Sequence, residues 1–362
     1  MSKQVWNGMG VMSGTSLDGI DLAWCRFEST GNGLLYNIVK ADTFPYDEEM
    51  RARLSNAFSM TALEYARLDV DVGRCIADCI NRWSSGMKNL DFIASHGHTI
   101  FHQPNAGLTT QIGSGAVIAA RTGITTVCDF RTVDVALQGQ GAPLVPIGDE
   151  LLFGEFDACL NLGGFANVSY KEQGQRVAFD TSPCNMALNY IASKLGAAYD
   201  KDGAFARAGN LVPPLLDALE SLPYYALPYP KSLGKEWYDE VFEPVVNRYL
   251  ADNEVKDVLH TVTCHIAQRV TSTLPKQAES MLVTGGGAHN AFLVEMLQRQ
   301  WNGRVCVPND LIVDYKEALV FAFLGFRRLM GLDNCLKSVT GACRDNCGGA
   351  VYLGGKDEIH RR

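Results

Sequence analysis

The sequence lacks the features of several large protein classes. Basic residues are in the minority: 32 Lys and Arg stand against 40 Asp and Glu, which gives a formal net charge of −8. A nucleic-acid-binding protein normally carries a basic surface, and an acidic chain fits poorly with an anionic membrane. No apolar run reaches the ~18 residues that a membrane-spanning helix needs. We therefore expect neither a nucleic acid nor a membrane as a partner.

A secretion signal and a disulfide framework are also missing. The N-terminal stretch MSKQVWNGMGVMSG has one Lys and no long apolar segment, unlike a secretory signal. The eleven cysteines are odd in number and scattered, which is typical of reduced thiols in a cytoplasmic protein. The pairs Cys75/Cys79 and Cys343/Cys347 are spaced more widely than the usual ligands of structural zinc. We expect a cytoplasmic location and no zinc.

What is present is the pattern of a globular α/β enzyme. With 362 residues, 47% hydrophobic and 20% charged, the chain fits two domains. Residues 9–27 predict a strand, a tight turn and a strand, and this pattern begins again at 158–170, after the Gly-rich segment 138–143. Strands then alternate with helices, which favours an α/β fold. We expect one domain from 1–135 with 335–362, a second from 136–334, and a ligand-binding cleft between them.

The first turn has the composition of a phosphate-binding loop. Ser13, Thr15 and Ser16 offer hydroxyl donors, and the glycines beside them let backbone N–H groups approach an anion. Asp18 and Asp21 would repel a phosphate, and a hydrated Mg²⁺ held between them resolves that conflict. An ordinary Gly- and Asp-rich hairpin turn remains the alternative.

Two further glycine-bearing turns follow strands. Residues 161–167 (Asn-Leu-Gly-Gly-Phe-Ala-Asn) repeat the first arrangement, and residues 284–287 (Thr-Gly-Gly-Gly) end a strand and open a helix. The triple glycine would let a flat group such as adenine lie against the backbone. One such turn is common, but three turns at strand ends favour a nucleotide site.

Three charged residues are candidates for a catalytic or substrate-binding role. Asp180 follows a strand and precedes Thr-Ser-Pro, a position suited to a general base, although position alone favours an Asx turn or a helix N-cap. Arg131 could bind a substrate carboxylate or pair with Asp129 or Asp134. Glu317 could contact substrate or be a first-turn acid of a helix that we expect to begin at Tyr315.

Three histidines, His96, His98 and His102, would point the same way on one strand. With no acidic or thiol ligand nearby, this pattern favours hydrogen bonds to substrate over a metal site. Neither a G-x-x-x-x-G-K-[ST] loop, a G-x-G-x-x-G loop nor a G-x-S-x-G elbow occurs.

Together these motifs resemble the anhydro-N-acetylmuramate kinase family of the actin/Hsp70/sugar-kinase superfamily. The resemblance covers almost the whole chain, and the stretches that carry it are 10–21 (GVMSGTSLDGID), 95–104 (SHGHTIFHQP), 129–131 (DFR), 138–146 (QGQGAPLVP), 161–167 (NLGGFAN), 179–185 (FDTSPCN), 230–236 (PKSLGKE), 284–287 (TGGG) and 317–319 (EAL).

The resemblance implies a two-lobed actin-like (ribonuclease H-like) fold that binds ATP and Mg²⁺. It implies hydrolysis of a 1,6-anhydro bridge joined to phosphorylation of O6, a step in recycling cell-wall fragments. Asp180 would be the base that activates water, and Asp18 and Asp21 would hold the metal. His96, His98, Arg131 and Glu317 would contact the sugar. The nucleotide would be bound by Ser13, Gly14, Thr15, Ser16, Leu17, Asp18, Gly19, Ile20, Asn161, Gly163, Gly164, Gly285, Gly286 and Gly287.

Two departures from the family pattern concern contacts near the predicted base. Ser182-Pro-Cys184 stands where the family usually has Gly-Pro-Gly, and Leu233 replaces a common Thr. Another actin-fold sugar kinase or phosphatase remains the main alternative, and an ATP-switched filament or chaperone-like protein a more distant one. A homodimer is compatible with the sequence.

Overall fold

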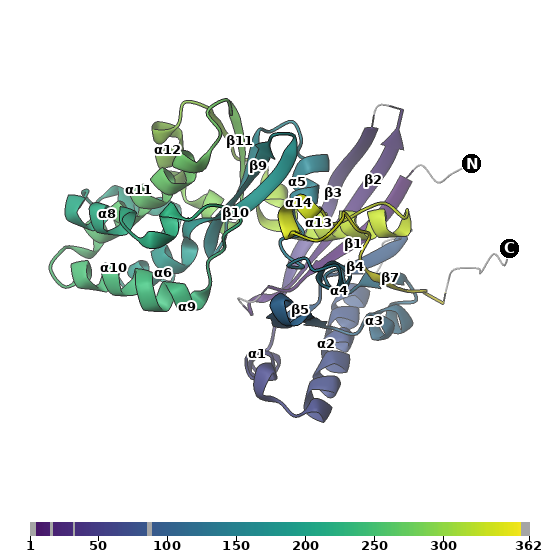
Figure 1. The fold of residues 1–362 in the computed structure, drawn as a ribbon. Helices are drawn as coiled ribbons and strands as arrows, with labels where there is room; N and C mark the ends of the chain where they lie inside the picture. Colours follow the sequence, from purple (N-terminus) through teal and green to yellow (C-terminus); the bar gives the residue numbers. More distant parts are fainter. Residues whose placement is uncertain (1–4, 15–16, 32, 85–88, 356–362) are drawn as a thin grey trace. The chain divides into compact units, whose positions relative to one another are not determined.

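The computed structural model describes residues 5–14, 17–31, 33–84 and 89–355, which form two compact units (Figure 1). The first unit contains the chain up to Leu152 and from Tyr315 onward, and the second runs from Phe153 to Asp314. The domain boundaries predicted from the sequence were 135/136 and 334/335. The observed boundaries differ from them because α5 (Pro146–Leu151) and the larger part of α13 (Asp310–Leu329) pack on each other within the first unit.

The first unit is built on the strands β1 (Val5–Met12), β2 (Gly19–Thr30), β3 (Gly33–Pro45), β4 (Phe92–Ser95), β7 (Thr125–Cys128) and β13 (Ala350–Tyr352). They form one mixed sheet in the order β13-β7-β4-β1-β2-β3. β1, β2 and β3 are antiparallel neighbours, whereas β4 and β7 run parallel to β1 on its other side. A small separate sheet joins β5 (His98–Gln103) and β6 (Leu108–Ile112).

The second unit repeats this topology with the strands β8 (Ala158–Leu162), β9 (Phe165–Glu172), β10 (Gln175–Pro183), β11 (Ser280–Thr284) and β12 (Arg304–Cys306). The sheet order is β10-β9-β8-β11-β12. β8, β9 and β10 are antiparallel, and β11 and β12 run parallel to β8. Each unit therefore has a three-stranded meander followed by two parallel strands, and the α/β class with actin-like mixed sheets is confirmed.

The helices of the first unit cover its sheet and are, besides α5 and α13, α1 (Glu48–Ser55), α2 (Ala62–Trp83), α3 (Gly115–Thr122), α4 (Thr132–Ala136) and α14 (Lys337–Thr340). Thr61 and Glu64 form a capping box at the start of α2, and its apolar stripe, including Leu68 and Ile76, joins the core with residues of β1 and β2. A Cβ on Gly10 of β1 would lie 1.8 Å from the carbonyl oxygen of Ala318. The glycine therefore lets the backbone of α13 lie directly against the sheet.

The helices of the second unit are α6 (Asn185–Ser193), α7 (Ala204–Arg207), α8 (Pro213–Glu220), α9 (Lys235–Trp237), α10 (Glu243–Leu250), α11 (Val255–Thr273) and α12 (Ala291–Gln300). Their core centres on α11, whose buried side chains cluster with those of β8 and β11. No helix in the described part of the chain has both the length and the apolar character to cross a membrane.

Candidate active site

The first predicted phosphate turn connects β1 to β2, and its described part is shaped by two residues. Leu17 has a φ of 60°, and a Cβ on Gly19 would lie 2.3 Å from the carbonyl oxygen of Phe44. Thr15 and Ser16 lie outside the described residues. Leu17 thus holds a left-handed conformation that is uncommon for a residue with a Cβ, and Gly19 allows a close approach to β3.

Ser13 anchors the turn from inside the first unit. Its hydroxyl is 2% exposed and lies 2.8 Å from the Tyr46 hydroxyl and 2.9 Å from Nδ1 of His98. Burial raises the pKa of Tyr46, so the phenol stays protonated. The Ser13 hydroxyl is thus already engaged by protein groups, and any phosphate contact from this residue would come most simply from its backbone N–H.

The two candidate metal ligands have different surroundings. Asp18 is exposed, whereas Asp21 lies on β2 and its Oδ1 accepts a hydrogen bond of 2.6 Å from the Thr43 hydroxyl. Among the described residues, no three His, Cys, Asp or Glu side chains come together in an arrangement that could hold a metal. Mg²⁺ commonly uses one or two carboxylates plus phosphate oxygens and water, so Asp18 and Asp21 suit Mg²⁺ bound together with a nucleotide.

His96 and Arg131 are brought together, although 35 residues separate them. Nε and an Nη of Arg131 donate to Nε2 of His96 at 3.1 and 2.8 Å, and the other Nη donates to the Gly141 carbonyl at 2.6 Å. Nδ1 of His96 donates to the Gly97 carbonyl at 2.9 Å, so the ring is neutral with its proton on Nδ1. Burial and the Arg131 charge lower the pKa of His96, which agrees with this assignment.

These contacts rule out the ion-pair alternative for Arg131 among the described residues, and its substrate contact stays a prediction. Arg131 hydrogen-bonds to His96 and Gly141 in place of the ion pairs with Asp129 or Asp134 considered above. Both ring nitrogens of His96 already have hydrogen-bond partners, Gly97 and Arg131, so this side chain is placed to orient Arg131. Burial lowers the pKa of Arg131 to about 10, against the opposing effects of Glu317, Cys335 and Asp134.

The expectation that His96, His98 and His102 face one way is wrong. His96 precedes β5, and the pairing of β5 with β6 shifts register between Thr99 and Phe101. This irregularity interrupts the alternation of faces on which the expectation depended. As a result His98 is buried beside Ser13, whereas His102 is exposed and contacts Thr109.

α13 begins at Asp310, but its backbone is non-helical at Tyr315 (φ −118°, ψ 17°), and a second helical segment starts there, at the residue expected from the sequence. Glu317 lies in the first turn of that segment, so the first-turn explanation of this residue is retained beside the predicted sugar contact. Burial raises the pKa of its carboxyl, Arg131 and Lys316 lower it, and Asp21 raises it again. The predicted sugar contacts Arg131 and Glu317 thus share one electrostatic environment with the predicted metal ligand Asp21.

Sequence reasoning missed a buried ion pair next to Glu317. Lys316 and Asp149 are each 4% exposed, and their charged atoms lie 2.6 Å apart, joining α13 to α5. Removing one member would leave the other charge buried without its partner, at a cost of roughly 3–5 kcal/mol. The apolar residues that follow Lys316 in α13 were the available signal that this lysine is buried.

In the second unit the structure brings two predicted glycine turns together. A Cβ on Gly285 would lie 2.6 Å from Oδ1 of Asn161, and one on Gly287 would lie 2.6 Å from the Leu162 side chain. Gly285 also has a φ of 83°. Asn185, which the sequence analysis did not single out, donates from Nδ2 to the Leu162 carbonyl at 2.9 Å. The turns after β8 and β11 therefore form one close-packed backbone surface.

The carbonyls of the glycine turn after β8 accept hydrogen bonds from the start of α6. The N–H groups of Cys184 and Asn185 donate to the carbonyls of Gly164 and Gly163 at 2.8 and 3.0 Å. Cys184 holds the N-cap position of α6, so Asp180, four residues earlier on β10, is not the cap. The helix-cap explanation of Asp180 is wrong.

Asp180 is held by a segment far away in sequence. Its Oδ2 accepts a hydrogen bond of 2.8 Å from the Leu233 N–H, its own N–H donates to Lys231, and its carbonyl accepts from the Tyr224 hydroxyl at 2.7 Å. Burial raises the pKa of Asp180 to about 6, opposed by the Leu233 bond. Leu233 acts here through its backbone N–H, so its replacement of the family's Thr leaves this contact intact.

Ser182 and Cys184, the other departures from the family pattern, are both buried. The Ser182 hydroxyl has no hydrogen-bond partner among the described residues. Burial raises the pKa of Cys184 to about 12, so its thiol stays protonated. Both side chains point into the protein, so neither extra Cβ occupies a position exposed to solvent.

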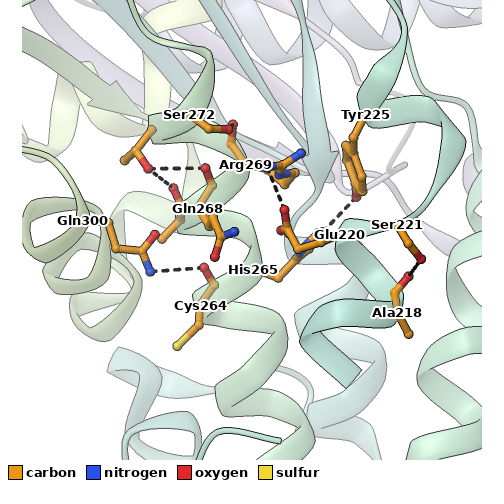
Figure 2. A network of polar contacts seen from close by, with 12 residues as sticks. Ala218, Glu220, Ser221, Tyr225, Cys264, His265, Gln268, Arg269, Ser272 and Gln300 are labelled. Atoms are coloured by element: carbon orange, nitrogen blue, oxygen red, sulfur yellow. Dashed lines mark hydrogen bonds and ion pairs between the residues drawn. The ribbon is translucent and has the colours of Figure 1, made fainter. Parts of the chain in front are cut away.

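A buried polar network supports the segment that holds Asp180 (Figure 2). His265 on α11 contacts Oε1 of Glu220 through Nδ1 at 2.7 Å and the Tyr225 hydroxyl through Nε2 at 2.9 Å. Arg269 pairs with the other oxygen of Glu220 at 2.7 Å and lies over the Tyr225 ring. Tyr224, the neighbour of Tyr225 in the chain, is the residue that hydrogen-bonds to Asp180. The network therefore holds the Tyr224–Tyr225 backbone in place through Tyr225.

Comparison with known proteins assigns the family. The family model described as anhydro-N-acetylmuramic acid kinase matches residues 7–354. The chain is 37% identical over 368 residues to a protein of that name from Aliivibrio fischeri, covering 95% of this chain and 98% of that one. A protein of the same name from Vibrio cholerae is also 37% identical, over 367 residues, with 95% and 97% covered.

Among solved structures, the activator of the 2-hydroxyisocaproyl-CoA dehydratase from Clostridium difficile with bound ADPNP matches over 90% of this chain and 96% of that one. Its sequence identity is 13% and its TM-score 0.45, a likeness too distant to carry an inference. The family model spans nearly the whole chain and the relatives match it end to end. The chain therefore belongs to the anhydro-N-acetylmuramic acid kinase family of enzymes.

Proposed function

We propose that the chain is an ATP-dependent kinase that opens the bridge of 1,6-anhydro-N-acetylmuramic acid and phosphorylates O6. The products are N-acetylmuramate 6-phosphate and ADP, and the reaction would run in the cytoplasm. The observation that carries this proposal is Asp180: a largely buried carboxyl with one N–H donor and a pKa raised to about 6. Such a group is ionised at neutral pH yet basic enough to accept a proton from water.

The chemistry assigned to Asp180 balances in two linked steps. Water attacks C1 of the sugar and gives its proton to the Asp180 carboxylate, while the bond from C1 to O6 breaks. O6 leaves as an alkoxide and attacks the γ-phosphorus of ATP, which releases ADP. The proton on Asp180 then passes to solvent before the next turnover. Bridge opening thereby produces the nucleophile for phosphoryl transfer.

The first-unit turn Ser13–Ile20 would bind the ATP phosphates. In the second unit, Asn161, Gly163, Gly164, Gly285, Gly286 and Gly287 would receive the nucleoside, because their glycines let the turns after β8 and β11 pack closely into one backbone surface. Asp18 and Asp21 would hold Mg²⁺, which would neutralise charge on the phosphates when it is bound with ATP. The Asp21 carboxylate is held by the Thr43 hydroxyl, so one of the two ligands is already oriented.

Arg131 and Glu317 would contact the sugar directly. A guanidinium suits a carboxylate such as the one this sugar carries, and His96 with the Gly141 carbonyl fixes its orientation. We assign His96 to orienting Arg131, while His98 stays a candidate sugar contact through the ring edge that does not face Ser13.

The test is a reaction with Mg-ATP and 1,6-anhydro-N-acetylmuramic acid in ¹⁸O-water, followed by mass spectrometry of the product. We expect the mass of phosphate plus water, with one ¹⁸O at C1. A product that gains phosphate alone, or turnover only with a different sugar, would favour another actin-fold sugar kinase. Release of inorganic phosphate from a sugar phosphate would favour a phosphatase.

A further inference from the structure

Asp134 on α4 is a buried carboxylate for which the reaction described above has no role. Its side chain is 0% exposed. Oδ1 accepts hydrogen bonds from Thr340, Asn346 and Cys335 at 2.9, 2.9 and 3.0 Å. Oδ2 accepts one of 2.8 Å from the Gly141 N–H. Four donors from two separate parts of the chain therefore meet on one carboxylate.

The fourth contact leads directly to Arg131. The N–H of Gly141 donates to Asp134, and the carbonyl of Gly141 accepts from Arg131 at 2.6 Å. Gly139 allows this approach, since a Cβ there would lie 2.1 Å from Oδ2 of Asp134. Moving the Asp134 carboxylate would consequently move the acceptor that orients the guanidinium.

The other three contacts connect the same carboxylate to the C-terminal segment Cys335–Asn346. This segment also pairs with the 137–141 loop through its backbone: Gln140 donates to the Thr340 carbonyl at 2.8 Å, and Cys343 donates to the Leu137 carbonyl at 3.0 Å. Together with the three side-chain hydrogen bonds to Asp134, these backbone bonds attach the segment to the loop.

We propose that Asp134 is a positioning residue for sugar recognition, and that it couples the C-terminal segment Cys335–Asn346 to Arg131 through Gly141. The inference rests on the proposed function, because it requires Arg131 to bind the sugar. Asp134 itself contacts neither substrate. Its effect passes through Gly141, whose N–H donates to Asp134 and whose carbonyl accepts from Arg131.

Thr340→Val tests the proposal without removing the carboxylate, which could prevent folding. The change deletes one donor to Asp134 and keeps the shape of the side chain. The change removes one hydrogen bond that holds Asp134, and Asp134 acts on the sugar only through Gly141 and Arg131. We therefore expect the KM for the anhydro-sugar to rise about threefold to tenfold. The KM for ATP and kcat should stay within about twofold of the unmodified protein. Thr340→Ser keeps the hydroxyl and should restore the KM, and Lys337→Ala, an exposed change on the same helix, should have no effect.

A double-mutant cycle with Arg131→Gln separates positioning from general destabilisation. If Asp134 acts through Arg131, Thr340→Val should add no further rise in KM once Arg131 is replaced. An additive rise, or a lower melting temperature in Thr340→Val with an unchanged KM, would overturn the proposal. If Arg131→Gln alone leaves the KM for the sugar unchanged, the role proposed for Arg131 fails first, and the two failures are distinguishable.

Discussion

In the first unit, Asp134 is fully buried and accepts hydrogen bonds from four donors. In the second unit, Asp180 is largely buried, and its carboxylate accepts one hydrogen bond, from Leu233. The two groups are chemically identical side chains in units of the same topology. They differ in how many donors the described parts of the chain supply, and the proposed function gives the base role to the carboxylate with fewer donors.

The physical reason is the cost of removing a charge from water. Four donors replace most of the hydration that the Asp134 carboxylate loses on burial. One donor does not do so for Asp180, and burial therefore raises its pKa to about 6. The raised pKa makes Asp180 a stronger base than an ordinary aspartate, which is the property that the proposed reaction requires of it.

The largest expected effect is on catalysis by Asp180→Asn. The amide keeps an acceptor for the Leu233 N–H but cannot take a proton, so kcat should fall by about 10³-fold. Nucleotide affinity, measured by calorimetry with a non-hydrolysable ATP analogue, should change by less than about twofold. Steady-state ADP release measures kcat.

Asp239→Asn is the matched control, because Asp239 is an exposed carboxylate of the second unit that pairs with Lys235. Its kcat should equal that of the unmodified protein. If Asp180→Asn retains more than about a tenth of kcat, Asp180 is not the base.

The second effect is on stability, where the two carboxylates should respond in opposite directions. Asp134→Asn places an amide N–H₂ among donors and should lower the free energy of unfolding by about 2–4 kcal/mol. Asp180→Asn should raise it at pH 7.5 by about 1–3 kcal/mol, because the ionised form of Asp180 is the one that the fold disfavours. Urea denaturation measures both.

The sign of the Asp180 effect depends on pH. The folded pKa of about 6 lies above the ordinary value of 3.8, so the folded state holds its proton more tightly than the unfolded state does. The protein loses this contribution as the pH rises from about 4 to about 6, and the gain from Asp180→Asn should disappear at pH 4. Equal gains at both pH values would contradict the burial of an ionised Asp180.

The smallest effect is expected from Tyr224→Phe. This change removes the hydrogen bond to the Asp180 backbone carbonyl but leaves the carboxylate and the Leu233 donor in place. We expect kcat to fall by about threefold to tenfold, corresponding to one ordinary hydrogen bond. The lower limb of the pH–kcat profile should stay where the raised pKa of Asp180, about 6, places it in both proteins. A limb shifted by a full unit would mean that Tyr224 acts on the carboxyl itself.

Much of the fold and part of the site were predictable from sequence, because they depend on neighbours along the chain. The two strand–turn–strand patterns and the helix beginning after Thr61 are local, and the structure contains them. The alignment of His96, His98 and His102 was not predictable, since the register shift in β5 arises from its pairing with β6. The buried state of Lys316 required Asp149, which lies on another helix.

By itself the sequence determined the strand and helix patterns, the glycine turns and the family, all of which can be identified from residues close together in the chain. Only the tertiary structure decided which donors reach each aspartate. The donors that reach Asp134 from the C-terminal segment lie 201–212 residues away, and the one that reaches Asp180 lies 53 residues away. A carboxylate's pKa and stability contribution depend on its total burial and hydrogen bonding, and these are defined only when distant segments pack together.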